Sequence, residues 1–161
     1  GKGVIKAIDM DSKKITIANE GNCYDLTLVN EIKNIDGRTV YKSDNVPKNT
    51  VDLTDSQWAV IKQGMRQMVS EHTSPSALIN QINVNVAGKT GTAEEDTTRP
   101  DHALFVSFAP YENPEVSVTC VIPHGYTSGN AEELAGMVYA YMYDPDKLDT
   151  LDITGNNQMS D

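Results

Sequence analysis

The sequence predicts an α+β fold in which an antiparallel sheet of at least three meander strands packs against two amphipathic helices. Apolar stripes at helical spacing occur on either side of a central region. That region holds three strand-like apolar segments separated by turn residues. At 161 residues the chain suits a single domain, 1–161, with a strand-rich lead-in (1–50), a core (52–143) and a polar tail (144–161).

The lead-in contains two candidate hairpins. Residues 4–18 alternate apolar and polar around a polar centre, which predicts a hairpin. Residues 26–32 predict a strand that pairs with the residues following the turn dipeptide Asp36-Gly37. The polar residues 43–50 predict a loop.

The first helix of the core is predicted to begin at Thr54. This threonine stands in capping-box spacing with Gln57, and the sequence around Pro75 ends the helix. Its predicted apolar stripe consists of Trp58, Ile61, Met65, Met68 and Val69.

The three predicted strands occupy residues 82–92, 102–109 and 115–122. Asn113 and Pro114 are turn-forming residues, and they predict a turn that joins the last two strands as a hairpin.

The second helix is predicted from a capping box of Asn130 and Glu133, and it ends before Pro145. Residues 146–161 are polar and predict a frayed tail. The predicted apolar face of this helix consists of Leu134, Val138, Tyr141 and Met142.

Composition excludes several classes of function. The net charge of −10, with 13 basic against 23 acidic residues, argues against nucleic-acid binding. No apolar run approaches the ~18 residues of a membrane span, so membrane attachment requires a segment outside this chain.

Neither the cysteines nor the histidines have the spacing of a metal site. Cys23 and Cys120 are expected to be unpaired thiols. His72, His102 and His124 stand far apart in the chain with no HExxH pattern, so we expect no metal and no cofactor.

The segment VAGKTGTAEE, residues 86–95, suggests a functional strand. Gly88 and Gly91 flank Lys89 directly after an apolar alternating run, and glycine in a strand marks a bulge or a close approach. Without the rest of the sequence, this segment could equally be an ordinary edge strand whose lysine is solvated.

The order of these elements resembles the C-terminal part of a penicillin-binding protein transpeptidase domain, especially of class B. The resemblance rests on KTGTAE, on the following HALFVSFAP, and on residues 17–32 and 52–69, and it extends to Tyr141. Residues 1–3, GKG, resemble the family's GQG, after which a helix normally leads to the IANGG-like segment at residues 17–21; the alternation of residues 4–18 favours the hairpin instead. The resemblance implies a partial β-lactamase/transpeptidase-like fold.

The family has three motifs, SxxK, SxN and KTG, and only KTG is convincingly present in this sequence. No serine has a lysine three positions later, so this chain contains no nucleophile of the family type. Ser43-Asp44-Asn45 spells SDN. In the family SxN precedes an IANGG-like segment, whereas this SDN follows the corresponding residues 17–21 (IANEG), so we interpret it as a solvated turn. We interpret the TxxK spacing of Thr39 and Lys42 as chance, because both residues belong to a strand beside a turn.

The resemblance assigns roles to the KTG residues. It implies that Lys89 and Thr92 are catalytic, Lys89 through its charge and proton traffic and Thr92 through a main-chain oxyanion donor. Thr90 and Thr92 would bind the carboxylate of a stem peptide or β-lactam. Gly91 would keep the inner face of the strand clear for substrate.

The predicted function is the KTG-bearing portion of a D,D-transpeptidase that cross-links peptidoglycan on the extracytoplasmic face of the membrane. The chain alone is expected to be catalytically incomplete, as a natural or artificial fragment. The alternatives are a non-catalytic module that binds a peptide, a β-lactam or a protein partner, and a structural domain with a decayed site. Sheet surface left uncovered by a missing half predicts self-association.

Overall fold

The computed structural model describes residues 16–44, 46–71, 78–95 and 97–150. Its centre is a three-stranded antiparallel sheet of β5 (Ala87–Ala93), β6 (His102–Ala109) and β7 (Val116–Ile122) in the order β5-β6-β7. The register pairs Thr90 with Phe105 and Phe105 with Cys120. This arrangement confirms the predicted meander, except that residues 82–86 precede the first strand instead of forming part of it.

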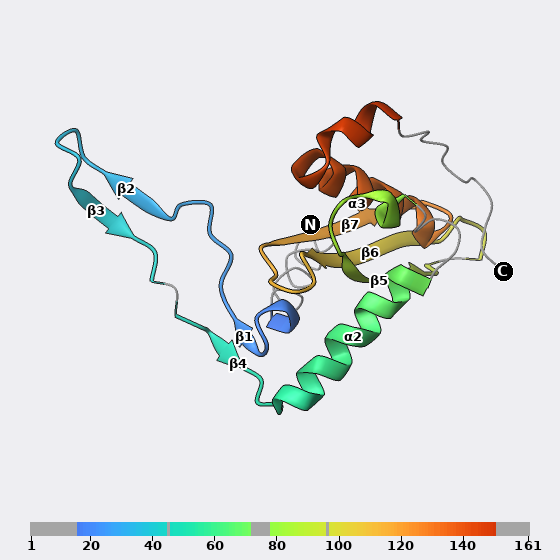
Figure 1. The fold of residues 1–161 in the computed structure, drawn as a ribbon, viewed down its shortest axis with the longest axis horizontal. Coiled ribbons are helices and arrows are strands. Elements are labelled where there is room, and N and C mark those ends of the chain that lie inside the picture. The colour runs from blue at the N-terminus through green and yellow to red at the C-terminus, as the bar shows by residue number, and fades with distance from the viewer. Residues whose placement is uncertain (1–15, 45, 72–77, 96, 151–161) are drawn as a thin grey trace.

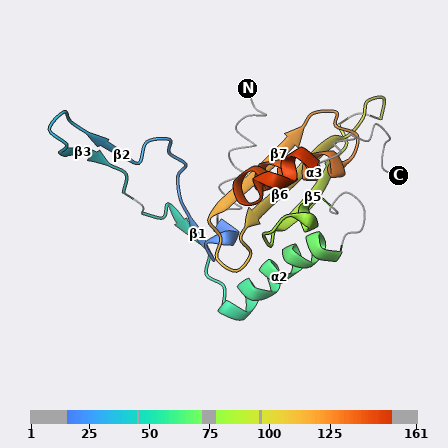
Figure 2. The same ribbon diagram turned by 45° about the horizontal axis from the view of Figure 1, so that its top comes forward.

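Two helices pack against this sheet, as predicted. Helix α2 (Asp55–Glu71) contacts β5, and α3 (Ser128–Tyr143) contacts β6 and β7. In Figures 1 and 2, α3 lies over the sheet while α2 runs along its β5 side. A short 3₁₀ helix, η2 (Ile79–Gln81), packs against α3 ahead of β5. None of the described helices has the length and hydropathy needed to span a membrane.

Helix α2 begins with the predicted capping box. The main-chain N–H of Thr54 donates to Gln57 Oε1 at 2.9 Å, and the N–H of Gln57 faces Thr54 Oγ1 at 3.4 Å. Trp58, Met65 and Val69 are buried as predicted, whereas Ile61 is 37% exposed. The helix ends at Glu71, and Pro75 lies outside the described residues.

The predicted cap of α3 is wrong. The N-cap is Thr127, whose backbone is extended and whose Oγ1 accepts the N–H of Gly129. Asn130 lies within the first turn instead, where its Nδ2 donates to the carbonyl of Gly125 at 2.8 Å.

The predicted apolar face of α3 is also wrong. The large residues predicted to be buried are substantially exposed: Leu134 43%, Val138 38%, Tyr141 72% and Met142 47%. Small residues let the helix backbone approach the sheet closely, so the periodicity of large apolar side chains marks the opposite face. The residues that the helix buries are Gly129, Ala131, Glu132, Ala135, Gly136, Tyr139 and Ala140.

The lead-in differs from the prediction at both ends. Residues 16–18 are helical, which contradicts that end of the predicted hairpin 4–18, and residues 4–15 lie outside the described part. Strands β1 (Asn22–Cys23) and β4 (Asn49–Thr50) form a short pair, so residues 49–50 are not loop as predicted.

The second predicted hairpin is present but shorter. Strands β2 (Glu31–Lys33) and β3 (Thr39–Lys42) pair across the turn at Asp36 and Gly37. The hairpin projects away from the rest of the chain in both views (Figures 1 and 2). Residues 26–30 are exposed and lie outside the strand, because no element in the described part of the chain covers their apolar side chains.

The first residues of the predicted frayed tail are helical instead. A 3₁₀ helix, η3 (Pro145–Thr150), follows α3, and Leu148 packs against the main apolar cluster. Burial of this leucine offsets the polarity of its neighbours, which dominated the prediction. Residues 151–161 lie outside the described part.

Candidate functional site

The three KTG residues, Lys89 to Gly91, and the following Thr92 lie on the edge strand β5. Burial decreases along this strand, from buried Ala87 and Gly88 to exposed Thr92. Because side chains alternate in a strand, Lys89 and Gly91 share one face of the sheet, and Thr90 and Thr92 share the other. The motif therefore presents a cation on one face and two hydroxyls on the other.

The two faces of the sheet are covered differently. On β6, Ala103, Phe105 and Ser107 are fully buried under α3. Leu104 and Val106, which alternate with them and pair with Gly91 and Lys89, are only half-buried. Lys89 thus projects from the more open face.

Lys89 is exposed, and its Nζ donates to the carbonyl of Thr90 at 2.9 Å. Within the described residues, no carboxylate forms an ion pair with this ammonium group. An ammonium without a carboxylate partner is free to meet an anionic group of a ligand.

The threonines differ in their surroundings. Thr90 is half-buried, and its Oγ1 lies 4.0 Å from the sulfur of Met68 on α2. Thr92 is exposed beyond it on the same strand. The outer part of the motif is therefore the part open to a ligand.

The two glycines around Lys89 meet different neighbours. A Cβ built on Gly88 would lie 2.5 Å from Phe105 Cζ and 2.9 Å from the carbonyl oxygen of Val106. At Gly91 the nearest atom is Leu104 Cβ at 3.5 Å, an ordinary contact. Packing within the chain therefore requires a glycine at position 88 but not at position 91.

Hydrogen bonds hold the start of β5 against α2. Arg66 donates from Nη1 to the carbonyl of Val86 at 3.2 Å and from Nη2 to Asn85 Oδ1 at 3.0 Å. Asn85 Nδ2 in turn donates to Glu112 Oε1 at 2.5 Å. The hydrogen bond from Asn85 lowers the pKa of the Glu112 carboxyl. This network sets where the KTG strand enters the sheet.

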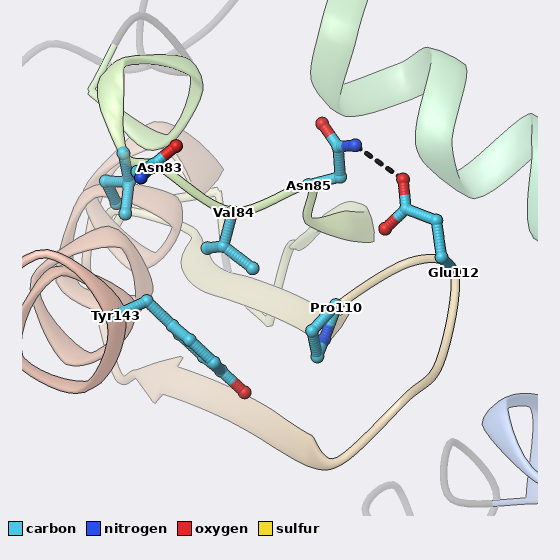
Figure 3. Close-up of a pocket in the computed structure, with 7 residues that line it drawn as sticks. Asn83, Val84, Asn85, Pro110, Glu112 and Tyr143 are labelled. Carbon is cyan, nitrogen blue, oxygen red and sulfur yellow. Dashed lines mark hydrogen bonds between the residues drawn. The ribbon is translucent and has the colours of Figure 1, made fainter.

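A pocket of about 450 Å³ lies beside that network (Figure 3). Val84, Pro110 and Glu112 are among the residues that line it, and the ring of Tyr143 reaches in from α3. Burial is the main cause that raises the pKa of the Tyr143 hydroxyl, and that hydroxyl has no partner within the described residues. The pocket borders the end of β6 at Pro110, whereas the exposed end of the KTG strand borders the start of β6 at His102.

The TxxK and SDN sequences, which resemble family motifs by spacing alone, lie away from the KTG strand. Thr39 and Lys42 belong to exposed β3 on the projecting hairpin, and the Thr39 hydroxyl donates to Glu31. The N–H of Ser43 donates to the Asn30 carbonyl at the base of that hairpin, and Asn45 lies outside the described residues. A further SxN triplet, Ser128-Gly129-Asn130, which was not recognised from the sequence, forms the first turn of α3.

Two histidines do not stand alone as the sequence suggested. The rings of His102 and His124 have centroids 4.8 Å apart, and His102 Nε2 lies 3.2 Å from Glu95 Oε2. The hairpin of β6 and β7 could have indicated this contact: His102 begins one strand and His124 follows the other, so the two meet at the same end of the sheet. Neither Cys23 nor Cys120 forms a disulfide in the described chain.

The sequence matches that of a known family over most of its length. Residues 14–142 match the family described as the penicillin binding protein transpeptidase domain. Penicillin-binding protein 2B of Streptococcus pneumoniae is 35% identical over 82 residues, covering 47% of this chain and 12% of that protein. The peptidoglycan D,D-transpeptidase PbpA of Mycolicibacterium smegmatis is 31% identical over 113 residues, covering 68% of this chain and 22% of that protein. The matched part therefore spans less than a quarter of either relative.

Solved structures show the same fold. The structure of penicillin-binding protein 2B from Streptococcus pneumoniae matches with a TM-score of 0.66 and 27% identity, covering 86% of this chain and 24% of that one. The imipenem acyl-enzyme complex of penicillin-binding protein A from M. tuberculosis matches with a TM-score of 0.68 and 24% identity, covering 81% of this chain and 29% of that one. These likenesses support the partial α+β transpeptidase fold.

Proposed function

The chain belongs to the family of penicillin binding protein transpeptidase domains, and from that premise we propose that β5 forms the KTG wall of a D,D-transpeptidase site for peptidoglycan cross-linking. The observation that carries the proposal is the position of Lys89: exposed, without a carboxylate partner in the described part of the chain, and on the open face of the sheet. Such a position suits a cation that approaches a nucleophile and an anionic substrate.

The neighbouring residues have separate roles in the proposed site. In the proposed site the substrate lies along the exposed edge of β5, where the hydroxyls of Thr90 and Thr92 bind the carboxylate of a stem peptide or β-lactam from the face opposite Lys89, and the main-chain N–H of Thr92 donates to the oxyanion. Gly91 leaves room for the substrate, a role consistent with the ordinary spacing that a Cβ would have there. Gly88 instead serves the packing of the strand on Phe105.

The nucleophile of the proposed reaction does not come from these 161 residues. No serine in the sequence has a lysine three positions later, and Thr39 with Lys42 lies on the exposed hairpin. One of the two oxyanion donors belongs to that nucleophile in the proposed site, so the chain alone lacks a complete oxyanion hole. We expect acylation only where a second part supplies both groups.

A second candidate is a non-catalytic module of the same fold that binds a peptide, a β-lactam or a protein partner. Absence of SxxK and SxN from the sequence encoded before Gly1 would favour it. The two candidates differ in whether a nucleophile meets Lys89 in the complete gene product. In either case the family relationship supports a location on the extracytoplasmic side of the bacterial membrane.

The experiment measures the rate of acylation by a fluorescent penicillin in the full gene product that contains residues 1–161. Lys89→Ala is expected to slow acylation by about a hundredfold, the effect of removing one preorganised electrostatic group from such a site. Lys42→Ala is the matched control, because it removes an exposed lysine from β3 and should leave the rate unchanged.

Two outcomes count against the proposal. A Lys89→Ala protein that acylates at the wild-type rate would remove Lys89 from the site. A wild-type gene product that folds but forms no adduct would favour the non-catalytic module.

A further inference from the structure

Three side chains from separate segments converge beyond the KTG strand. Glu95 follows β5, His102 begins β6, and His124 lies in the turn between β7 and α3. One ligand atom of each residue lies within 4.8 Å of those of the other two. The pairing of Ala93 with His102 brings this cluster to the exposed end of the KTG strand.

His124 is held in a fixed orientation. Its backbone has a φ of 54°, a left-handed conformation that is uncommon outside glycine. Its Nδ1 lies 3.0 Å from the carbonyl oxygen of Pro100. Because a carbonyl only accepts, Nδ1 carries the proton and Nε2 keeps its lone pair. A histidine whose other nitrogen donates to a main-chain carbonyl is the usual arrangement of a metal ligand.

His102 and Glu95 supply the other two groups. The main-chain N–H of His124 donates to His102 Nδ1 at 3.0 Å, so Nε2 of His102 carries the proton and faces Glu95 Oε2 at 3.2 Å. A metal at Nε2 requires the neutral ring to change tautomer, so that the proton moves to Nδ1 and the hydrogen bond from the His124 N–H is lost. One hydrogen bond is a small loss against the binding free energy of a metal with three protein ligands.

The spacing of the cluster suits a tetrahedral ion. Zinc bonds to nitrogen and oxygen are about 2.0–2.2 Å long, which places adjacent ligand atoms of a tetrahedral site about 3.3–3.6 Å apart. The His102–Glu95 distance of 3.2 Å is already close to this value. The Glu95 side chain is 63% exposed and free to adjust its distance to each histidine, whereas the two histidines approach each other only by rotation of their rings.

We propose that Glu95, His102 and His124 bind a divalent transition-metal ion such as Zn²⁺. Imidazole nitrogens select zinc and its neighbours over magnesium and calcium, and two histidines with one glutamate form a known three-ligand zinc set that leaves the fourth position to water. The bound ion ties the connection after the KTG strand to the turn before α3. This site is independent of the acylation proposed above.

The experiment titrates the metal-free 161-residue chain with Zn²⁺ by isothermal calorimetry and with Co²⁺ by absorption spectroscopy. We expect one equivalent of Zn²⁺, a Co²⁺ spectrum typical of tetrahedral coordination, and a rise in thermal stability with Zn²⁺. Glu95→Gln and His124→Asn should each weaken binding by at least about tenfold. Asparagine is chosen because it tolerates the left-handed backbone of residue 124.

Glu94→Gln is the matched control, since it removes the neighbouring exposed carboxylate and should leave Zn²⁺ affinity unchanged. Thermal unfolding without metal checks that each variant folds. The proposal is overturned if the folded wild-type chain binds no stoichiometric Zn²⁺. It is equally overturned if Glu95→Gln and His124→Asn bind as tightly as the wild type, because Zn²⁺ would then bind elsewhere.

Discussion

The hydroxyl of Tyr139 donates a hydrogen bond of 3.0 Å to Ser107 Oγ inside the core. Ser107 Oγ donates onward to the carbonyl of Val118 at 3.2 Å, so one chain of hydrogen bonds joins α3, β6 and β7. Tyr139 and Ser107 are fully buried. Burial raises the pKa of Tyr139 above its usual range, and the hydrogen bond to Ser107 partly opposes that shift.

Tyr139 is expected to make the fold sensitive to alkali. Its pKa is higher in the folded chain than in the unfolded chain, so the stabilisation is fully present below the unfolded pKa of about 10 and is lost as pH rises above it. Between the unfolded and the folded pKa, the free energy of unfolding falls by about 1.4 kcal/mol per pH unit for this one proton. Urea unfolding at pH 8 and above pH 10 measures it, and Tyr143, whose pKa is also raised, adds in the same direction.

Tyr139→Phe should reduce this alkaline loss, while lowering the free energy of unfolding at pH 8 by about 0.5–1.5 kcal/mol through the missing hydrogen bond. Tyr141→Phe is the control, because Tyr141 is 72% exposed and should change neither quantity. An unaltered alkaline slope in Tyr139→Phe would contradict the assigned role of burial.

Gly88→Ala is expected to destabilise the fold, whereas Gly91→Ala is not. The added methyl at position 88 would meet the buried ring of Phe105 and the main-chain oxygen of Val106, and such overpacking costs about 1–3 kcal/mol. At position 91 the methyl makes only an ordinary contact with Leu104, so the change should stay within about 0.5 kcal/mol. Urea unfolding of the two variants decides the matter, and equal stabilities would refute the packing difference.

The open face of the sheet predicts self-association of the isolated chain. Val121, paired with Leu104 on the face away from α3, is 41% exposed. Exposed apolar surface on a sheet favours association, because contact with a second molecule removes that surface from water. Sedimentation velocity should show a weight-average mass that rises with concentration.

Val121→Lys should reduce that rise, because it charges the face. Val46→Lys, which makes the same change at a 68% exposed site in the lead-in, should not. Monomers at every concentration would contradict the prediction.

Local patterns in the sequence predicted the elements better than their packing. The capping box of Thr54 and Gln57 involves neighbours in the chain, and the structure confirms it. The buried face of α3 depends on how closely the helix approaches the sheet, which small residues such as Ala135 and Gly136 decide. Large apolar residues dominate a periodicity analysis, so it selected Leu134 and Tyr141, which are exposed.

The same distinction holds for the candidate site. Lys89 and its neighbours were found because the motif is contiguous, although only the structure separates Gly88, required by packing, from Gly91. The contact between His102 and His124 was missed because strand register, not chain proximity, creates it. Contiguous motifs are readable from one sequence, whereas clusters across a sheet need the pairing of its strands.

We propose that the KTG strand, β5, forms one wall of an acylation site whose nucleophile lies outside residues 1–161. Intact mass spectrometry of the 161-residue chain after incubation with excess benzylpenicillin, followed by peptide mapping of any shifted species, shows whether the chain contains a nucleophile of its own. We predict an unshifted mass. A stoichiometric adduct that maps within the chain, with Thr39 and Ser43 as the first residues to inspect, would contradict the account, because the chain would then contain its own nucleophile.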